Sequence, residues 1–323
     1  MGYRTGRLVV VSEGKKLRIL GEVLGDYRKN GDETLFFCPV CDHHKRKLSV
    51  NIDKDVFKCW VCDWSGRSIY RAVRRYGTVS HRSAWKKLSN KIEIESFSEV
   101  LFGKAEPERQ QVLNLPRSFQ TLVHGPYSRS ANDAKNYLYN RGIDDEDIIR
   151  WKIGYCATGQ YAERIVVPSF NLNGDPNYFI SRSYTGHPKK YLNPRAGRDI
   201  VFNELMVDFD DDLVIVEGVF DAIKAGINSV PLLGSTLRDG SYFFQKIVKY
   251  DTPLFLGLDP DAKRKQGKMI RAMLEYGLEL YEMDVPAGKD IGDLTKKQVA
   301  KLKQEAAYIN PDNYLLMHSI NGI

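Results

Sequence analysis

Four cysteines in one short window constrain the fold of this chain more than any other feature. The window FFCPVCDHHKRKLSVNIDKDVFKCWVCDWSGRS has the spacing C-x2-C-x17-C-x2-C and holds Cys38, Cys41, Cys59 and Cys62. Each C-x2-C pair can turn two thiolates toward one ion, and four thiolates complete a tetrahedral zinc site. The alternation in KLSVNIDKDVFKC predicts a β-hairpin that turns at Asp53–Asp55. We therefore predict a zinc ribbon with one structural zinc, because a closed four-thiolate site has no position for water.

The other residues of metal-ligating type in and after this window have simpler interpretations. His43 and His44 could substitute as ligands, but we interpret them as exposed polar residues of a basic loop. Cys156 is isolated in the sequence, and we interpret it as a small buried apolar residue.

Positive charge is concentrated in the N-terminal part. The net charge is +7, yet residues 1–91 hold 20 Lys and Arg against 9 Asp and Glu, while the remainder has an acidic excess. This asymmetry favours a polyanion-binding module such as a nucleic-acid surface; a Lys-rich but otherwise ordinary domain is the alternative. Cations and aromatic residues alternate in the ribbon: Lys45, Arg46, Lys47, Phe57, Lys58, Trp60 and Trp64. Cations meet phosphates and aromatic faces stack on unpaired bases, although either tryptophan could instead belong to the core.

The length of the whole chain predicts two or three domains. Its 323 residues are 42% hydrophobic and 28% charged. No apolar run approaches membrane-spanning length and no signal-peptide pattern follows the start, so we expect a cytoplasmic protein without membrane contact. SIYRAVRRYG predicts a basic helix that stops at Gly77. We place the ribbon domain at residues 1–90, a linker at 91–120, a basic α+β subdomain at 121–208 and an α/β domain at 209–323.

The middle of the chain predicts two short helices and a β-hairpin. NDAKNYLYNRGIDDEDIIRW has helical spacing on both sides of Gly142, and RIVVPSF and NYFISRSY alternate like strands around the turn NLNGDP. Several cations punctuate the segment that contains these strands: Arg164, Arg182, Lys189, Lys190, Arg195 and Arg198. Their clustering favours a phosphate-binding surface over unrelated surface charges.

The C-terminal part predicts a parallel sheet whose strands end in acids. LVIV, NSVPLLG, TPLFLGL and LELYEMD each precede a helical segment, which is typical of an open α/β domain. Acids follow three of these strands: Glu217, Asp221, Asp259, Asp261, Asp290 and Asp293. Ligands bind beyond the carboxyl ends of such strands, and clustered carboxylates need a cation. We predict a Mg²⁺ or Mn²⁺ site. Helix N-caps are the alternative for each acid, and Asp221 stays open between metal site and helix structure.

The order of zinc ribbon, basic middle segment and acid-bearing sheet resembles that of DnaG-type DNA primases. The resemblance is closest to the stand-alone primases of T-even-like bacteriophages. CPVC…FKCWVCDWSG looks like the primase zinc motif, with Cys41 where many members have His. ERIVVPSFNLNGDPNYFISRS resembles the strand–turn–strand motif, and PKKYLN the motif whose Lys faces nucleotide or template. VEGVFDA, LLGSTL, LDPD and GKDIGDL resemble successive TOPRIM motifs.

The resemblance implies a TOPRIM catalytic domain that makes short RNA primers on single-stranded DNA from ribonucleoside triphosphates. It makes Glu217, Asp259 and Asp261 the catalytic metal acids, with Asp290 and Asp293 contributing. It also implies residues that hold nucleotide or template: Arg164, Arg182, Lys190, Lys45, Lys47 and Trp60. The implied partners are a replicative helicase on a separate chain and a single-strand-binding protein, in the host cytoplasm if the chain is phage-encoded.

The sequence departs from the family pattern at three places. Asn203 and Glu204 stand where the family has His-Lys, so that Arg195 or Arg198 would have to supply the cation. The Gly after LDPD is delayed to Gly267, and GKDIGDL lacks the family's Pro. The alternatives are a TOPRIM nuclease or recombination factor, which would not need the strand–turn–strand motif, and a non-catalytic single-strand-binding module. The acids argue against the latter because they repel DNA unless metal intervenes.

Overall fold

The chain divides into two compact units, Met1–Phe97 with Tyr308–Ile323, and Ser98–Ala307. In the part of the chain that the structure describes, no helix is long and apolar enough to cross a membrane. Most of the predicted linker and Asp261 lie outside the described residues. This computed structural model describes residues 5–66, 68–89, 111–125, 128–234, 237–238, 240–259, 263–311 and 313–314, with the backbone alone for 5–12 and 263–265.

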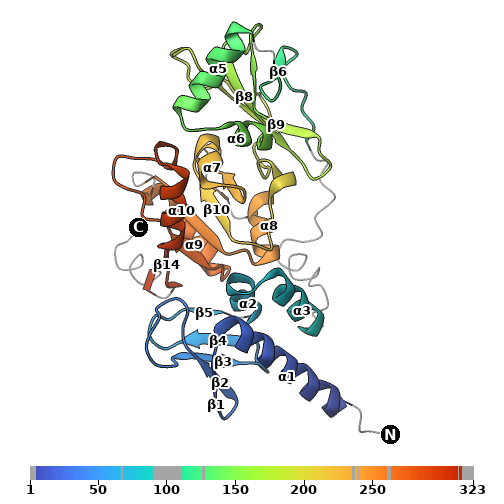
Figure 1. The fold of residues 1–323 in the computed structure, drawn as a ribbon, viewed down its shortest axis with the longest axis vertical. Helices are drawn as coiled ribbons and strands as arrows, with labels where there is room; N and C mark the ends of the chain where they lie inside the picture. The colour runs from blue at the N-terminus through green and yellow to red at the C-terminus, as the bar shows by residue number, and fades with distance from the viewer. Residues whose placement is uncertain are drawn as a thin grey trace. The chain divides into compact units, whose positions relative to one another are not determined.

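The first unit contains the predicted zinc ribbon as an antiparallel sheet (Figure 1). Its strands, in sheet order, are β1 (Arg28–Asn30), β2 (Glu33–Phe36), β3 (Leu48–Asn51), β4 (Val56–Cys59) and β5 (Ser65–Gly66). The predicted hairpin is confirmed, since β3 and β4 pair from Leu48 opposite Cys59 to Asn51 opposite Val56. Asp55 takes a left-handed φ of 53° in the turn, a conformation that Asp tolerates better than most residues. The turn therefore lies where the sequence predicts it.

Three helices accompany the ribbon: α1 (Thr5–Leu24), α2 (Tyr70–Tyr76) and α3 (Val79–Ser89). The predicted basic helix is α2, and the Gly77 N–H closes it by donating to the Val73 carbonyl at 2.8 Å. Neither α1 nor α3 was predicted. One core joins the three helices to the sheet through Leu20, Phe36, Leu48, Trp64, Val73 and Trp85.

The second unit begins with an antiparallel sheet and two short helices. The sheet has the order β6 (Phe119–Thr121), β7 (Gly154–Cys156), β8 (Arg164–Phe170) and β9 (Pro176–Ser183), and the helices are α5 (Arg129–Asn140) and α6 (Asp145–Arg150). Both predicted helices and the predicted hairpin are present. Gly142, at φ +68°, separates the helices, because this left-handed backbone suits glycine. Cys156 is buried in the core of this sheet, as expected.

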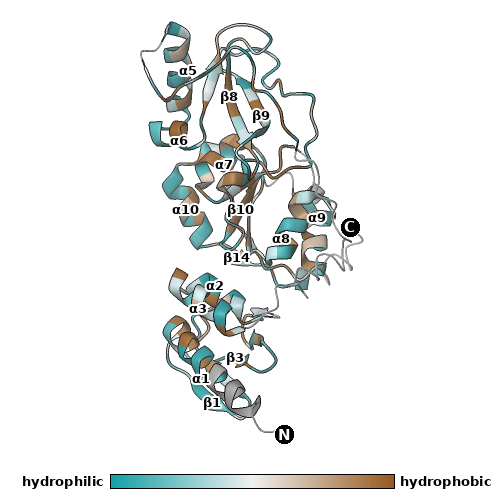
Figure 2. Cartoon of the chain, turned by 90° about the vertical axis from the view of Figure 1, so that its right-hand side faces the viewer, coloured by the Kyte–Doolittle hydropathy of each residue, from teal (hydrophilic) through white to brown (hydrophobic). Residues whose placement is uncertain are grey.

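The second sheet of this unit is the predicted α/β part. Its order is β11 (Ser229–Pro231), β10 (Leu213–Val216), β12 (Leu254–Gly257), β13 (Leu280–Glu282) and β14 (Ala307–Tyr308), and β11, β10, β12 and β13 are parallel. The helices are α7 (Val219–Ala225), α8 (Tyr242–Tyr250), α9 (Lys263–Glu275) and α10 (Lys296–Gln304), with one-turn helices η1 (Glu204–Met206) and η3 (Ile291–Asp293). Figure 2 shows α7 and α10 on one side of the apolar strand β10, and α8 and α9 on the other.

The strand order of this sheet determines where a ligand can bind. From β10 the chain passes to β11 on one side and then crosses to β12 on the other. The loops after β10 and β12 therefore diverge at a topological switch point, where open α/β sheets form their ligand crevice. Glu217 and Asp259 follow these two strands directly or within two residues.

Candidate zinc site and candidate active site

The four cysteines of the ribbon form a compact ligand group. Their sulfur atoms all lie within 4.8 Å of one another, with 3.7 Å between Cys38 and Cys62 and 3.9 Å between Cys41 and Cys59. A tetrahedral zinc ion with Zn–S bonds of about 2.3 Å separates its sulfur ligands by roughly 3.8 Å. Burial raises the pKa of the Cys62 thiol to about 11, so a cation is needed to hold it as a thiolate near neutral pH. The cysteines therefore fit a structural zinc ion.

Two matching turns bring the cysteine pairs together. In each, the residue after the second cysteine, Asp42 or Asp63, takes a left-handed φ of 46° or 58°. Its N–H donates to the carbonyl of the first cysteine, at 3.0 Å for Cys38 and 3.1 Å for Cys59. These turns fold both thiol groups of a pair to one side.

The two histidines of this loop do not join the ligand group. Their rings stack on each other with centroids 4.3 Å apart, and His43 Nδ1 accepts a hydrogen bond from the Lys45 N–H at 3.1 Å. Among the described residues, no other set of three or more Cys, His, Asp and Glu side chains is grouped as closely as these four cysteines; the acids of the second unit lie further apart.

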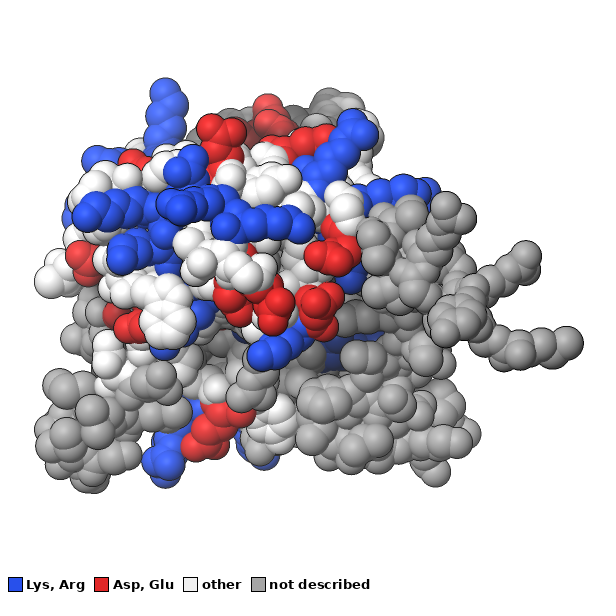
Figure 3. All heavy atoms as spheres, turned by 90° about the horizontal axis from the view of Figure 1, so that it is seen from below, with Lys and Arg blue, Asp and Glu red and all other residues white. Residues whose placement is uncertain are grey.

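The two tryptophans of the ribbon have opposite environments. Trp64 is fully buried in the ribbon core, whereas Trp60 is 67% exposed. The Lys58 ammonium lies 5.4 Å from the centroid of the Trp60 ring and 3.3 Å from an Asp63 carboxylate oxygen. Lys45 and Lys47 are exposed as well. Figure 3, which views the molecule from below, shows a band of Lys and Arg side chains with acidic side chains beside it. Of the two tryptophans, Trp60 is therefore the one whose ring is open to solvent.

Two acids of the second unit, Glu217 and Asp259, follow β10 and β12 at the switch point of the parallel sheet. Glu217 Oε1 accepts hydrogen bonds from the Asp259 backbone N–H at 3.2 Å and from Gln266 Nε2 at 3.0 Å. This contact ties the end of β10 to the end of β12.

Asp221 and Asp290 lie against each other across Gly292. A Cβ atom placed on Gly292 would lie 2.7 Å from Asp221 Oδ1 and 3.1 Å from Asp290 Oδ1, so a larger residue there would displace one or both carboxylates. Burial raises the pKa of Asp221 to about 7, and the charges of Asp290 and Asp259 add to this effect. The Gly218 N–H, which donates to Asp221 Oδ2 at 2.8 Å, acts in the opposite direction. Asp221 is thus both a helix-end acceptor and a member of the acidic group that we call the acidic edge: Glu217, Asp221, Asp259 and Asp290.

Asp290 and Asp293 also form a reciprocal cap. Asp290 Oδ1 accepts the Asp293 N–H at 2.8 Å, and Asp293 Oδ2 accepts the Asp290 N–H at 3.3 Å, which closes η3. Asp290 and Asp293 therefore both make the helix N-cap contact that the sequence offered as the alternative to metal binding. Asp290 additionally faces Asp221, whereas Asp293 is exposed.

Two arginines flank Phe220, directly before Asp221. The guanidinium carbons of Arg182 and Arg141 lie 5.1 and 5.2 Å from the centroid of the Phe220 ring. Arg182 also donates to the hydroxyls of Tyr137, at 2.6 Å, and Tyr191. Arg141, which the sequence analysis did not single out, follows α5 immediately before Gly142. The only feature of the neighbouring sequence that could have pointed to Arg141 is the turn glycine that follows it.

Arg164 and Lys190 have different environments from each other. Arg164 is 4% exposed, and its guanidinium donates to the carbonyls of Lys189 at 2.8 Å and Lys190 at 3.0 Å. Lys190 itself is exposed. Arg164 thus holds the loop that carries Lys190, because its donors are directed at the backbone.

Glu204 is a structural anchor. It is 2% exposed, lies 3.1 Å from Lys246 Nζ and accepts a hydrogen bond from the Tyr242 hydroxyl at 2.8 Å. A buried carboxylate needs such partners. Glu204 therefore fixes η1 to α8.

Lysines join the antiparallel and parallel parts of the second unit. Lys296 Nζ of α10 lies 2.8 Å from Asp144 Oδ2 and 2.7 Å from Asp147 Oδ2, at the start of α6. Lys224 Nζ of α7 donates to the Gly142 carbonyl at 3.1 Å. These contacts fix the turn that carries Arg141 relative to α7 and the acidic edge.

The chain is similar to DNA primases in both sequence and fold. Residues 15–102 match the family model of the CHC2 zinc finger. The DNA primase of Staphylococcus epidermidis (strain ATCC 12228 / FDA PCI 1200) is 23% identical over 350 residues, which cover 89% of this chain and 58% of that protein. The DNA primase of Staphylococcus aureus (strain COL) is 22% identical over 341 residues, 87% of this chain and 56% of that protein. This chain thus spans less than two thirds of the length of either relative.

Two solved structures share their fold with part of this chain. The DnaG primase catalytic domain bound to ssDNA matches with a TM-score of 0.52 and 20% identity, over 64% of this chain and 80% of that chain. The E. coli primase catalytic core matches with a TM-score of 0.50 and 19% identity, over 61% of this chain and 79% of that chain. The chain thus shares a zinc-finger segment with the CHC2 family model and a fold with these two primase structures.

Proposed function

We propose that the chain synthesises short RNA primers on single-stranded DNA from ribonucleoside triphosphates, by metal-dependent nucleotidyl transfer. The observation that carries the proposal is the acidic edge with two arginines beside it, in a fold shared with a primase catalytic domain. Carboxylates grouped around an acid with a raised pKa suit a hard divalent cation, and guanidiniums suit phosphates.

The residues that would hold Mg²⁺ or Mn²⁺ are Glu217, Asp259 and Asp261, with Asp290 and Asp293 contributing. Asp221 joins this set on the strength of its contact with Asp290 across Gly292. When bound, the cation lowers the pKa of an attacking 3′-hydroxyl and stabilises the charge on the transferred phosphate and the departing pyrophosphate.

The basic residues beside the acidic edge would orient the nucleotides. Arg182 is held by two tyrosine hydroxyls and by Phe220, so its guanidinium is already fixed when a phosphate arrives. Arg141 shares the same ring. We assign Lys190 to nucleotide or template and Arg164 to positioning the Lys190 loop, because the Arg164 donors point at backbone carbonyls. Fixed cations require little reorganisation during the reaction.

The zinc ribbon would dock on single-stranded template. The exposed Trp60 would stack on an unpaired base, and Lys45, Lys47 and Lys58 would meet phosphates. A separate replicative helicase, a single-strand-binding protein, the T-even phage type and the host cytoplasm are further parts of the proposal, which rest on the resemblance of the motifs.

The test offers single-stranded DNA, the four ribonucleoside triphosphates and Mg²⁺ to the full chain and measures new RNA on a denaturing gel. We expect short RNA that depends on template and metal and is lost in Asp259→Asn. Degradation of the DNA without RNA synthesis would favour the nuclease alternative. Absence of RNA on templates of every sequence, even with the helicase supplied, would reject the primase proposal.

A further inference from the structure

The one-turn helix η1 buries its acid and presents its apolar side chains to solvent. Glu204 is 2% exposed, whereas Leu205 and Met206 are 45% and 41% exposed. Ile227, in the loop between α7 and β11, is 58% exposed. A single apolar side chain in water is ordinary, but apolar side chains that gather in one place mark a surface for a partner.

Met206 and Ile227 gather around one small pocket. Its volume of about 10 Å³ holds one water-sized group, far below the roughly 300–1,000 Å³ of small-ligand sites. Asn203 in its wall is 5% exposed, and its Oδ1 has no hydrogen-bond partner among the described residues, so the pocket offers an acceptor to a donor group. The pocket therefore suits the end of one side chain of a larger partner. Its other lining residues are Arg150, Trp151, Val207 and Ser229.

An acidic loop adjoins this pocket. Residues 207–212 read VDFDDD, with four Asp and no Lys or Arg. The Asn228 side chain, directly after Ile227, accepts the Asp208 N–H at 2.9 Å. It donates in turn to the carbonyls of Asp208 at 2.8 Å and Asp212 at 3.0 Å. The aspartates are thus tied to the loop that carries the exposed isoleucine.

The charge of the acidic loop is held in a fixed place. Thr252 Oγ1 donates to the Phe209 carbonyl at 2.7 Å, and the Phe209 ring is buried. Asp208 is exposed and forms no ion pair with another described residue. Of the described residues that line the pocket, Arg150 is the only cation, and it is paired with Glu146. A fixed acidic loop attracts the cations of a partner at little cost in ordering.

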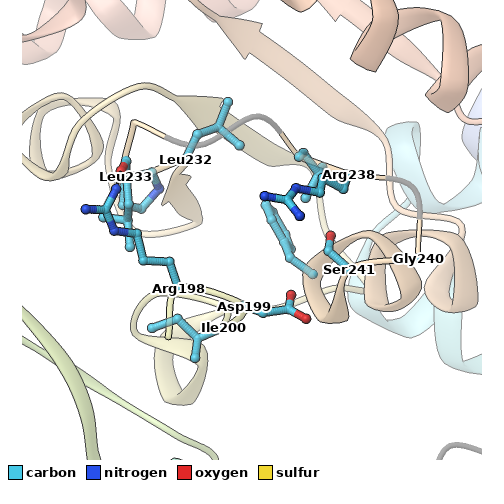
Figure 4. Close-up of a pocket in the computed structure, with 11 residues that line it drawn as sticks. Arg198, Asp199, Ile200, Leu232, Leu233, Arg238, Gly240 and Ser241 are labelled. Carbon is cyan, nitrogen blue, oxygen red and sulfur yellow. Dashed lines mark hydrogen bonds between the residues drawn. The ribbon is translucent and has the colours of Figure 1, made fainter. Parts of the chain in front are cut away.

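This pocket and the ligand-binding side of the sheet lie at opposite ends of β11. Ile227 comes just before this strand, and residues 208–212 come directly before β10. A larger cavity, of about 470 Å³, lies beyond the other end of β11, with Leu232, Leu233 and Arg238 around it (Figure 4). The acidic edge belongs to these carboxyl ends of the strands. A partner at the amino end therefore leaves the acidic edge free.

The charge and the neighbouring strand narrow the kind of partner. The aspartates repel the phosphates of a nucleic acid. The edge strand β11 contains Pro231, which has no N–H to donate to an added strand. An amphipathic helix, in contrast, offers apolar side chains at i, i+3, i+4 and i+7 and can carry cations on its flanks.

We propose that Met206, Ile227 and the acidic loop 207–212, together called the amino-end surface, bind a basic amphipathic helix of a partner protein. The apolar side of the helix packs on Met206 and Ile227, and its Lys or Arg residues face the aspartates. Methionine suits this role because its flexible thioether adapts to the shape of its neighbour. This inference goes beyond the proposed function, because the amino-end surface lies away from the acidic edge.

The experiment measures, by fluorescence anisotropy, how tightly the full chain binds a fluorescein-labelled helical peptide of Leu and Lys. The Leu residues of this peptide recur at i, i+3, i+4 and i+7. The double variant Met206→Ser/Ile227→Ser should bind it at least about tenfold more weakly, because both apolar contacts are lost. Asp208→Lys should weaken binding about fivefold, because a cation then faces the lysines of the peptide.

Matched variants control for exposure and charge. Leu172→Ser removes an exposed apolar side chain of the β8–β9 turn, and Glu305→Lys reverses an exposed acid after α10. Both should bind the peptide as tightly as the wild type. A peptide with Glu in place of every Lys should bind much more weakly than the Lys peptide to the wild type.

Three outcomes would overturn the proposal. The first is equal affinity of the wild type and the double variant for the Lys peptide, at unchanged melting temperature and zinc content. The second is equal binding of the Lys and Glu peptides, since the aspartates then play no part. The third is a dimer of the full chain, seen by sedimentation, that the double variant loses, because the surface then belongs to a second copy. The peptide measurement involves no RNA synthesis, so the proposed function can fail while this inference stands.

Discussion

The zinc site and the acidic edge are both built from side chains that could hold a metal, but they are assembled differently. The zinc site draws its four ligands from two short turns joined by one hairpin, and its sulfurs lie within 4.8 Å of one another. The acidic edge draws its carboxylates from the loops after β10 and β12, from the first turn of α7 and from the start of η3, and burial, followed by the charges of Asp290 and Asp259, raises the pKa of Asp221 to about 7. Short local turns thus bring the zinc ligands together, whereas the acidic edge forms only when the whole parallel sheet has folded. The acidic edge also keeps carboxylates that repel one another.

The largest expected effect comes from removing a zinc ligand. Cys59→Ser should abolish the one bound zinc and the cooperative melting of the ribbon unit, because zinc supplies about 10–16 kcal/mol of apparent binding energy in small zinc domains. Zinc per chain, measured by mass spectrometry, should fall from one to zero. Cys156→Ser, a buried cysteine outside the ligand group, should keep its zinc. Full zinc retention in Cys59→Ser would contradict the ribbon assignment.

Neutralising one acid of the edge should leave the fold intact but remove activity. Asp259→Asn should lower primer synthesis by about 10²–10³-fold or more, since a lost metal ligand costs several kcal/mol in the transition state. The measurement is the initial rate of RNA synthesis at saturating Mg²⁺. Glu275→Gln, which alters an exposed pair with Arg271, is the control and should keep the wild-type rate. A wild-type rate in Asp259→Asn would remove this acid from the site.

Replacing Asp221 by Asn should show separately how its carboxylate affects folding stability and how it affects metal binding. Its pKa is raised from 3.8 to about 7 in the folded chain, so folding stability declines as pH rises from about 4 to 7, by at most about 4 kcal/mol. Asp221→Asn should therefore raise the melting temperature at pH 8 and leave it nearly unchanged at pH 4. Added Mg²⁺ should stabilise the wild type more than the variant. Equal stabilisation of both proteins by Mg²⁺ would assign Asp221 to helix structure alone.

The smallest expected effect concerns the surface of the ribbon. Trp60→Ala should weaken binding of single-stranded DNA about tenfold, because stacking of one base contributes about 1–3 kcal/mol. Fluorescence anisotropy at fixed salt measures this change. Val79→Ala removes another exposed apolar side chain of the same unit and should have no effect. If the two variants bind equally well, Trp60 is not a stacking platform.

The sequence predicts those parts of the fold that rest on short-range patterns. The β3–β4 hairpin, α2, α5, α6 and the parallel strands follow from alternation, turn residues and apolar runs. Helix α3 escaped prediction because Trp85 is its one buried residue, so it has no apolar periodicity. Helix α1 carries Gly14 and Gly21, which lower helix propensity, and tertiary packing of Leu17 and Leu20 compensates for this.

For the candidate site, residue types could be predicted but not their surroundings. The sequence identifies acids at strand ends, yet the pKa of Asp221 depends on its burial and on Asp290, about seventy residues further along the chain. Arg164 and Arg182 look alike in the sequence, but the first is directed at two carbonyls and the second at two tyrosines. Arg141 could not be singled out, because only the packing of the α5–α6 turn on α7 brings it to Phe220.

The ion pairs of Lys296 mean that the boundary drawn at residue 208 does not separate two autonomous pieces. Asp147 is 1% exposed, and the lysine that neutralises it comes from the other side of that boundary. Cutting the chain there would leave a buried carboxylate without its partner, at a cost of several kcal/mol. We therefore expect the arginine-bearing and acid-bearing halves of this unit to unfold together.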